Sequence, residues 1–260
     1  MPNNDKPIGV FDSGLGGITV LSELYTLMPN ENYIYIGDNK NAPYGTKSED
    51  EVFDHTEENI KNLLKNECKA IVIACNTATS IAAERLRKRY SVPIIGIEPA
   101  IKPAVVYHPS SVVIVMATPL TLKKEKFLNL MNNYSSISRI IPLPSPGLVE
   151  LIEKGITDGE QIDMYLKKLF SPLANENIST VVLGCTHYPF IKKSIEKYFN
   201  FKTDIIDGGE GTAKETRRRL AEIDSLNKNK HPGNIHFKSS MDSKTEIDLM
   251  KKMFELLKKQ

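Results

Sequence analysis

Short apolar runs alternate with longer amphipathic stretches along the whole chain. In the first half, these runs cover residues 8–11, 33–37, 70–74 and 92–97. Each run is rich in Val, Ile and Tyr and too short for a buried helix, so each predicts a strand. The stretch before the third run has helical spacing at Val52, Ile60, Leu63 and Leu64, with acidic residues early and lysines late, as suits the helix dipole. Strands that alternate with helices predict an α/β fold with a mainly parallel sheet.

The second half of the chain repeats the pattern of the first. Its apolar runs cover residues 111–116, 138–143, 180–184 and 203–206, each about 103 to 111 positions after its counterpart. The third runs match best, IVIACNTAT against VVLGCTHYP, and they place Cys75 and Cys185 in register. A repeat of this length favours duplication of one structural unit. We therefore predict two similar doubly wound lobes, each built on a mainly parallel sheet.

The part of the chain after residue 207 has no counterpart in the repeat. Ile247, Met250, Phe254 and Leu257 fall on one helical face there, which predicts a closing helix. The preceding NKNKHPGN is typical of a loop. If the chain crosses back after the eighth strand, this tail belongs to the first lobe. The expected lobes are then residues 1–97 plus 208–260 for the first and residues 98–207 for the second.

Small polar or reactive side chains follow several of the predicted strands: Asp12, Ser13, Cys75, Thr118 and Cys185. In parallel sheets, functional groups gather where strands end and helices begin. We therefore expect one site between the two lobes. The loop FDSGLGG, after the first strand, suits a small-anion cradle or simply a tight turn. It is not a dinucleotide fingerprint, because Thr19 stands where the third glycine belongs.

Two thiols at equivalent points of a repeat indicate acid–base chemistry. A helix N-terminus lowers a thiol pKa, and the free value of about 8.5 needs only modest tuning for proton transfer near neutral pH. One thiolate can remove a proton from a carbon while the other thiol returns one to the opposite face, which inverts a stereocentre. No covalent cofactor is required. The carbanion needs hydrogen-bond donors, and the candidates are Asn76, Thr77, Thr118 and Thr186. We assign the third cysteine, Cys68, to packing.

Other interpretations of these residues remain open at this point. His187 can orient or protonate a group, bind a metal or cap a helix, and Asp12 can tune the site or cap a helix. Cys185 with His187 as base can attack as a hydrolase nucleophile, but this leaves Cys75 without a role. Zinc binding by the two cysteines and His187 lacks the usual paired C-x₂-C spacing, so no metal is expected.

Composition narrows the class of protein further. The 260 residues are 40% hydrophobic and 25% charged, and 34 basic against 32 acidic residues give a net charge of +2. This balance disfavours a nucleic-acid-binding protein, and the absence of a long apolar run disfavours a membrane protein. Three cysteines and an N-terminus unlike a signal peptide favour a cytoplasmic protein without disulfides. The expected partner is a small-molecule substrate.

The motifs FDSGLGG, YIGDNKNAPYGTKS, VIACNTATS, GIEPA and VLGCTHYPF, in this order, resemble the glutamate racemase family of the cofactor-independent aspartate/glutamate racemase superfamily. The resemblance spans nearly the whole chain. It implies two α/β lobes related by pseudo-twofold symmetry and interconversion of L- and D-glutamate, which supplies D-glutamate for peptidoglycan. It also implies a homodimer. The alternative within the superfamily is aspartate racemase, but that branch tends to have Glu where this chain has His187.

The resemblance also implies roles for individual residues. Cys75 and Cys185 are the two acid–base groups, Asp12 assists Cys75, and His187 assists Cys185. PGLVELIE matches a family motif that places Glu153 near the site, with Glu150 as a weaker candidate, although LPSPG departs from the family's common Cys-Pro pattern. The residues that line the substrate are Asp12, Ser13, Pro43, Tyr44, Gly45, Asn76, Thr77, Thr118, Thr186 and His187.

Overall fold

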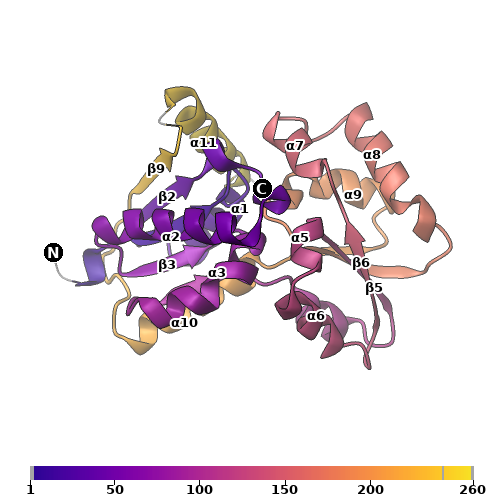
Figure 1. Ribbon diagram of the computed structural model, residues 1–260, viewed down its shortest axis with the longest axis horizontal. Coiled ribbons are helices and arrows are strands. Elements are labelled where there is room, and N and C mark those ends of the chain that lie inside the picture. The colour runs from indigo at the N-terminus through magenta and orange to yellow at the C-terminus, as the bar shows by residue number, and fades with distance from the viewer. Residues whose placement is uncertain (1–2, 242, 259–260) are drawn as a thin grey trace. The chain divides into compact units, whose positions relative to one another are not determined.

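The computed structural model describes residues 3–241 and 243–258 and divides the chain into two compact units (Figure 1). Unit 1 comprises Met1–Glu98 and Gly209–Gln260, and unit 2 comprises Pro99–Gly208. The boundaries expected from the sequence lie one residue earlier at each crossing. Within the described residues, no helix is both long enough and apolar enough to cross a membrane.

Unit 1 is built on a five-stranded parallel sheet of order β4-β3-β1-β2-β9. Its strands are β1 (Ile8–Asp12), β2 (Tyr33–Gly37), β3 (Ala70–Ile73), β4 (Ile94–Gly96) and β9 (Ile235–Ser239). Its helices are α1 (Ile18–Leu27), α2 (Glu49–Lys65), α3 (Asn76–Arg89), α10 (Gly209–Glu222) and α11 (Lys244–Leu257), with the short 3₁₀ helices η1 (Asn3–Asp5), η2 (Asn39–Asn41) and η3 (Tyr44–Thr46). The first four strands match the predicted runs, whereas the sequence analysis missed β9.

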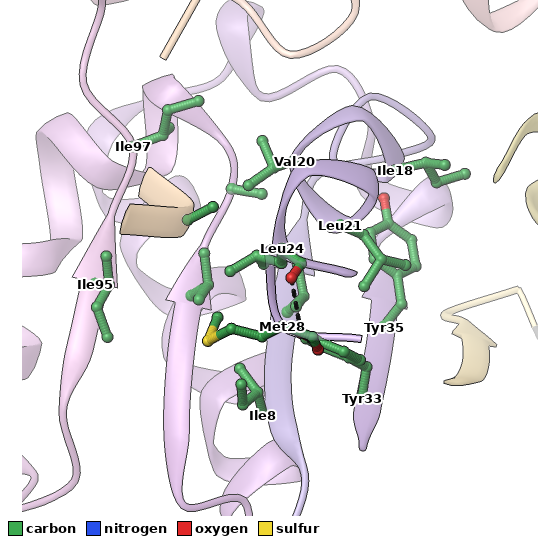
Figure 2. Packing of buried hydrophobic residues seen from close by; sticks show 14 of the residues in the cluster. Ile8, Ile18, Val20, Leu21, Leu24, Met28, Tyr33, Tyr35, Ile95 and Ile97 are labelled. Atoms are coloured by element: carbon green, nitrogen blue, oxygen red, sulfur yellow. Dashed lines mark hydrogen bonds between the residues drawn. The ribbon is translucent and has the colours of Figure 1, made fainter. Parts of the chain in front are cut away.

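One face of this sheet packs on α1, α10 and α11. Ile8 and Tyr33 of the strands meet Leu21 and Leu24 of α1, and all four are buried (Figure 2). The Tyr33 hydroxyl donates to the backbone oxygens of Leu24 at 3.0 Å and Met28 at 2.9 Å, which satisfies a buried polar group inside the core. On the other face, α2 packs against α3. Helices therefore cover both faces, as a doubly wound sheet requires.

The predicted closing helix is confirmed as α11. Met250 and Phe254 are buried in the core of unit 1, and Ile247 and Leu257 are partly buried. The Phe254 ring meets Tyr25 of α1 edge-on, with centroids 5.6 Å apart. The apolar stripe read from the sequence thus packs onto the first unit.

Unit 2 is built on a four-stranded parallel sheet of order β6-β5-β7-β8. Its strands are β5 (Val112–Ala117), β6 (Arg139–Pro144), β7 (Ile178–Leu183) and β8 (Asp204–Asp207). Its helices are α4 (Ile101–Tyr107), α5 (Pro119–Leu122), α6 (Glu125–Asn132), α7 (Leu148–Glu153), α8 (Glu160–Phe170) and α9 (Lys192–Tyr198), with 3₁₀ helices η4 (Ser171–Leu173) and η5 (Tyr188–Ile191). Two apolar clusters cover the two faces of the sheet.

The two units share one strand order, as a duplication predicts. When β1 to β4 are matched in sequence with β5 to β8, both sheets read fourth, third, first, second. The hydrogen bonds agree: Ala74 N donates to Phe11 O at 2.8 Å, and Gly184 N donates to Met116 O at 2.7 Å. The next residue in each unit is a cysteine, so Cys75 and Cys185 occupy equivalent positions. The predicted α/β class with two mainly parallel sheets is confirmed.

Candidate active site

Cys75 lies between β3 and α3, at the position that caps the helix. Its backbone is extended, and its sulfur accepts from the Ala78 N–H at 3.5 Å. The thiol also donates to the Ser13 hydroxyl oxygen at 3.5 Å, and the residue is 5% exposed. The N–H groups of a first helical turn favour negative charge. This position therefore suits a thiol that must become a thiolate during a reaction.

Asp12 and Ser13 belong to the glycine-rich turn after β1. The Asp12 side chain is fully buried, and its Oδ1 accepts from Gly14 N at 3.0 Å. The N-terminal cap of α1 is Gly17, so the interpretation of Asp12 as a simple cap of that helix is wrong. A Cβ at Gly17 would lie 2.5 Å from the Asp12 Cβ. Glycine is therefore required there, because the start of the helix passes directly over the carboxylate.

Asn76 and Thr77 form the first turn of α3 and are both buried. Within the described part of the chain, neither the oxygen nor the nitrogen of the Asn76 amide has a hydrogen-bond partner. A buried polar group without a partner costs about 1–3 kcal/mol, and native proteins rarely tolerate one. The amide offers one donor group and one acceptor beside the Cys75 thiol, as a ligand-binding side chain would.

The segment 38–46, between β2 and α2, carries Pro43, Tyr44 and Gly45. We call it loop 38–46. The Tyr44 hydroxyl is buried and donates to Asp38 Oδ2 at 2.6 Å. Burial raises the Tyr44 pKa well above its ordinary value, and the Asp38 carboxylate that accepts from its hydroxyl adds to this. Tyr44 therefore stays a neutral hydroxyl, and η3, which it begins, packs against the helix that Cys75 caps.

Asp38 is a buried carboxylate that the sequence analysis missed. Its oxygens accept from the Asn41 amide at 3.0 and 3.1 Å as well as from Tyr44, and its N–H donates to Asp12 O at 2.9 Å. Its sequence signal was a carboxylate directly after an apolar strand, the same signal that identified Asp12. Asp38 thus links loop 38–46 to the turn after β1.

Cys185 is the equivalent residue of unit 2, at the end of β7. A Cβ at Gly184 would lie 2.8 Å from Met116 O, so glycine allows the strand end to approach β5. The Cys185 sulfur lies 3.8 Å from His187 Nδ1, and His187 Nε2 lies 2.5 Å from Glu153 Oε1 of α7. Glu153, rather than Glu150, carries this hydrogen bond. Thiol, imidazole and carboxylate therefore form one chain of hydrogen bonds.

His187 is buried between its two partners. Burial by itself disfavours the charged imidazolium, but the hydrogen bonds and charges of Cys185 and Glu153 outweigh it and raise the His187 pKa well above 6.5. In the described chain, the His187 ring makes no capping hydrogen bond to η5. The interpretation of His187 as a side-chain helix cap is therefore wrong. A charged imidazolium carries two N–H donors, so His187 can donate both to the Cys185 sulfur and to the Glu153 carboxylate.

Thr118 and Thr186 complete the predicted residues of unit 2. Thr118 caps α5: its Oγ1 accepts from Thr121 N at 3.3 Å and lies 2.9 Å from Thr121 Oγ1. Thr186 is 4% exposed and lies between Cys185 and His187 in the chain. Unit 1 therefore presents a cysteine with Ser13, Asn76 and the Tyr44–Asp38 pair, and unit 2 presents a cysteine with an imidazole and a carboxylate.

The raised His187 pKa predicts a pH-dependent contribution to stability. A group whose native pKa lies above its unfolded value stabilises the fold fully below the unfolded pKa, and this contribution is lost as pH rises through the native pKa. The free energy of unfolding lost in His187→Asn should therefore be larger at pH 6 than at pH 9. Urea unfolding at both pH values measures this, and Glu153→Gln should reduce the dependence. Equal losses at both pH values would contradict an imidazolium held by these partners.

Known proteins resemble this chain along nearly its full length. The family model described as Asp/Glu/Hydantoin racemase matches residues 20–216. A glutamate racemase of Clostridium perfringens is 51% identical over 253 residues, which cover 97% of each chain. The crystal structure of glutamate racemase from Francisella tularensis in complex with D-glutamate aligns at TM-score 0.83 and 32% identity, covering 96% of this chain and 94% of that one. A glutamate racemase isoform from Bacillus anthracis aligns at TM-score 0.85 and 30% identity, with the same coverage.

Proposed function

Because the chain belongs to the Asp/Glu/Hydantoin racemase family, we propose that it interconverts L-glutamate and D-glutamate. The observation that carries this proposal is the equivalence of Cys75 and Cys185, two thiols at the same strand end of a duplicated sheet. A two-base racemase needs two groups of matched acidity, and duplication of a cysteine-bearing unit supplies them. The glutamate specificity is supported by relatives named glutamate racemase, one of them bound to D-glutamate.

In the proposed reaction, one thiolate removes the α-proton of glutamate, and the other thiol donates a proton to the opposite face of the carbanion. Cys75 takes the proton from D-glutamate and Cys185 takes it from L-glutamate. Asp12 assists Cys75, while His187, oriented by Glu153, assists Cys185. The hydrogen bonds from His187 to both Cys185 and Glu153 support the second assignment. No cofactor takes part.

The polar groups of the substrate need hydrogen-bond donors and acceptors that are not already bonded to other groups of the protein. The unpartnered Asn76 amide supports a place in substrate binding, because its oxygen can accept from the α-ammonium group and its nitrogen can donate to a carboxylate. We assign the remaining contacts to Ser13, Pro43, Tyr44, Gly45, Thr77, Thr118, Thr186 and His187.

D-Glutamate is a component of bacterial peptidoglycan, so we propose that the protein acts in cell wall biogenesis and the maintenance of cell shape. We place it in the cytoplasm, where L-glutamate is available and where three free cysteines stay reduced. We further propose that it works as a homodimer. These three assignments rest on the family resemblance and on the chain's cysteine content.

The function is tested by incubating the purified, chelator-treated protein with either enantiomer of glutamate and no added cofactor. The circular dichroism signal of glutamate should decay to zero from both directions. In deuterium oxide, the product should carry one deuterium at the α-carbon. Decay with aspartate but not with glutamate would identify an aspartate racemase instead, and no decay with either would refute the proposal.

A further inference from the structure

The fifth strand of unit 1 has no counterpart in unit 2. β9 pairs in parallel with β2, and Ser239 lies opposite Gly37 at the end of β2. In unit 2, the equivalent strand β6 is the last strand of its sheet. β9 therefore brings the C-terminal segment to the carboxyl end of β2, where loop 38–46 begins.

Ser240, the residue after β9, contacts the start of this loop twice. Its backbone N–H donates to Gly37 O at 3.0 Å, and its hydroxyl oxygen accepts from the Lys40 N–H at 3.0 Å. The second bond joins a serine side chain to a backbone group 200 residues away in sequence. The contact is therefore tertiary and does not follow from the sheet ladder.

The Lys40 N–H needs an acceptor from outside its own helical turn. η2 begins after Asp38, and the first N–H groups of such a turn have no acceptor within it. An Asp at this capping position ordinarily accepts one of them. In the described chain, Asp38 makes no such bond, because its carboxylate accepts from Asn41 and Tyr44 instead. The Ser240 hydroxyl supplies the missing cap.

The start of η2 matters because of what loop 38–46 holds. Asp38 is bonded through its N–H to Asp12 O and through its carboxylate to the Tyr44 hydroxyl. Tyr44 is 1% exposed and begins η3, which packs against α3, the helix that Cys75 caps. A displacement of η2 would thus be transmitted to the buried side chains beside the thiol.

The segment that carries Ser240 is anchored to the core of unit 1 by α11. The Ser239 hydroxyl donates to Glu246 of α11, and Met250 of the same helix is fully buried. A Cβ built on Gly37 would lie 2.7 Å from the Met250 methyl carbon. The end of β2 therefore rests directly on α11, and Ser240 projects from an anchored element.

We propose that Ser240 is a positioning residue for racemisation, whose hydroxyl caps η2 and thereby holds Asp38 and Tyr44 against the Cys75 group. The proposal rests on the proposed function, because its consequence is measured in glutamate turnover. Ser240 acts through the Lys40 N–H. In this proposal, the segment that contains β9 and Ser240 helps to position the site as well as completing the core of unit 1.

The test compares Ser240→Ala with Ser240→Thr, which keeps the hydroxyl, and with Ser135→Ala, which removes an exposed hydroxyl that donates to Asn132 O in unit 2. Loss of one neutral hydrogen bond corresponds to a roughly 3- to 10-fold effect. We expect kcat/KM of Ser240→Ala to fall by this factor while Tm falls by no more than about 5 °C. Hydrogen exchange of the Lys40 amide should accelerate by a similar factor. Ser240→Thr and Ser135→Ala should behave like wild type.

Three results would overturn the positioning role. The first is unchanged kinetics in Ser240→Ala, and the second is an equal loss of kcat/KM in Ser240→Thr. The third is a fall in the kcat of Ser240→Ala that is fully explained by a smaller fraction of folded protein, with KM and the hydrogen exchange of the Lys40 amide unchanged. The wild-type assay separates this proposal from the proposed function. If wild-type protein racemises glutamate and Ser240→Ala does so equally well, the racemase assignment stands and the positioning role fails.

Discussion

Alanine at either Cys75 or Cys185 is expected to lower kcat/KM for glutamate racemisation by about 10²- to 10⁴-fold in both directions, the usual contribution of a general acid or base. In the proposed scheme each thiol is the base for one enantiomer and the acid for the other, so both directions should suffer. The circular dichroism assay measures the loss. Cys68→Ala is the matched control: burial raises the pKa of the Cys68 thiol to about 12, so this thiol stays protonated and its removal should leave turnover unchanged.

The two single variants also separate the roles of the thiols. Cys185→Ala retains Cys75 and should still exchange the α-proton of D-glutamate with deuterium oxide without inverting it. Cys75→Ala should do the same with L-glutamate. Exchange with the opposite enantiomers would reverse our assignment of the two thiols. Racemisation by either variant at the wild-type rate would refute the two-base scheme.

The inner strands of the repeat, such as β1, β3, β5 and β7, could be read from the sequence because they are buried on both faces. Continuous Val- and Ile-rich runs such as 70–74 leave no alternative to a central parallel strand. The edge strands β4, β6 and β8 each carry two adjacent isoleucines, whereas the edge strand β9 has no adjacent apolar residues and escaped. Its sequence IHFKS alternates partly buried and exposed positions, and it follows the polar loop NKNKHPGN. An alternating run of five residues beside a loop carries a weak signal.

The candidate site could be proposed from the sequence as far as local motifs reach. Cys75, Cys185 and their neighbours stand out because each motif encodes a strand end followed by a helix start. The partners across the fold were not predictable from the residues alone. The bond between His187 and Glu153 joins the residue before η5 to the end of α7, and the Tyr44–Asp38 pair depends on how loop 38–46 turns back. Such contacts depend on tertiary packing, which periodicity does not encode.

A buried ion pair in unit 1 illustrates the same limit. Lys69 Nζ lies 2.6 Å from Glu31 Oε2, and the two side chains are 0% and 3% exposed. The ammonium also donates to Asn4 O at 2.6 Å and Ser225 O at 2.7 Å. The other Glu31 oxygen accepts from Asn227 N at 2.7 Å. This cluster ties the N-terminal part of unit 1 to the segment after α10, yet each residue alone resembles an ordinary surface charge.

Replacing Lys69 with methionine should therefore lower the free energy of unfolding by about 3–5 kcal/mol, the cost of leaving a buried charge without its partner. Methionine keeps the apolar stem, so the loss comes from the Glu31 carboxylate and from two backbone oxygens deprived of their donor. Urea unfolding measures the effect. Lys88→Met is the control, because the Lys88–Glu84 pair is 74% and 82% exposed and should contribute at most about 1 kcal/mol.

The double variant Lys69→Met with Glu31→Gln distinguishes the origin of the loss. A glutamine carries no charge, so the double variant should recover part of the stability that Lys69→Met alone loses, although Gln still needs hydrogen-bond partners. If Lys69→Met cost no more than Lys88→Met, the pair would be as dispensable as a surface ion pair. If instead the double variant were less stable than Lys69→Met, the unpaired carboxylate would not be the cause, and the lost contacts of the ammonium with Asn4 and Ser225 would account for the effect.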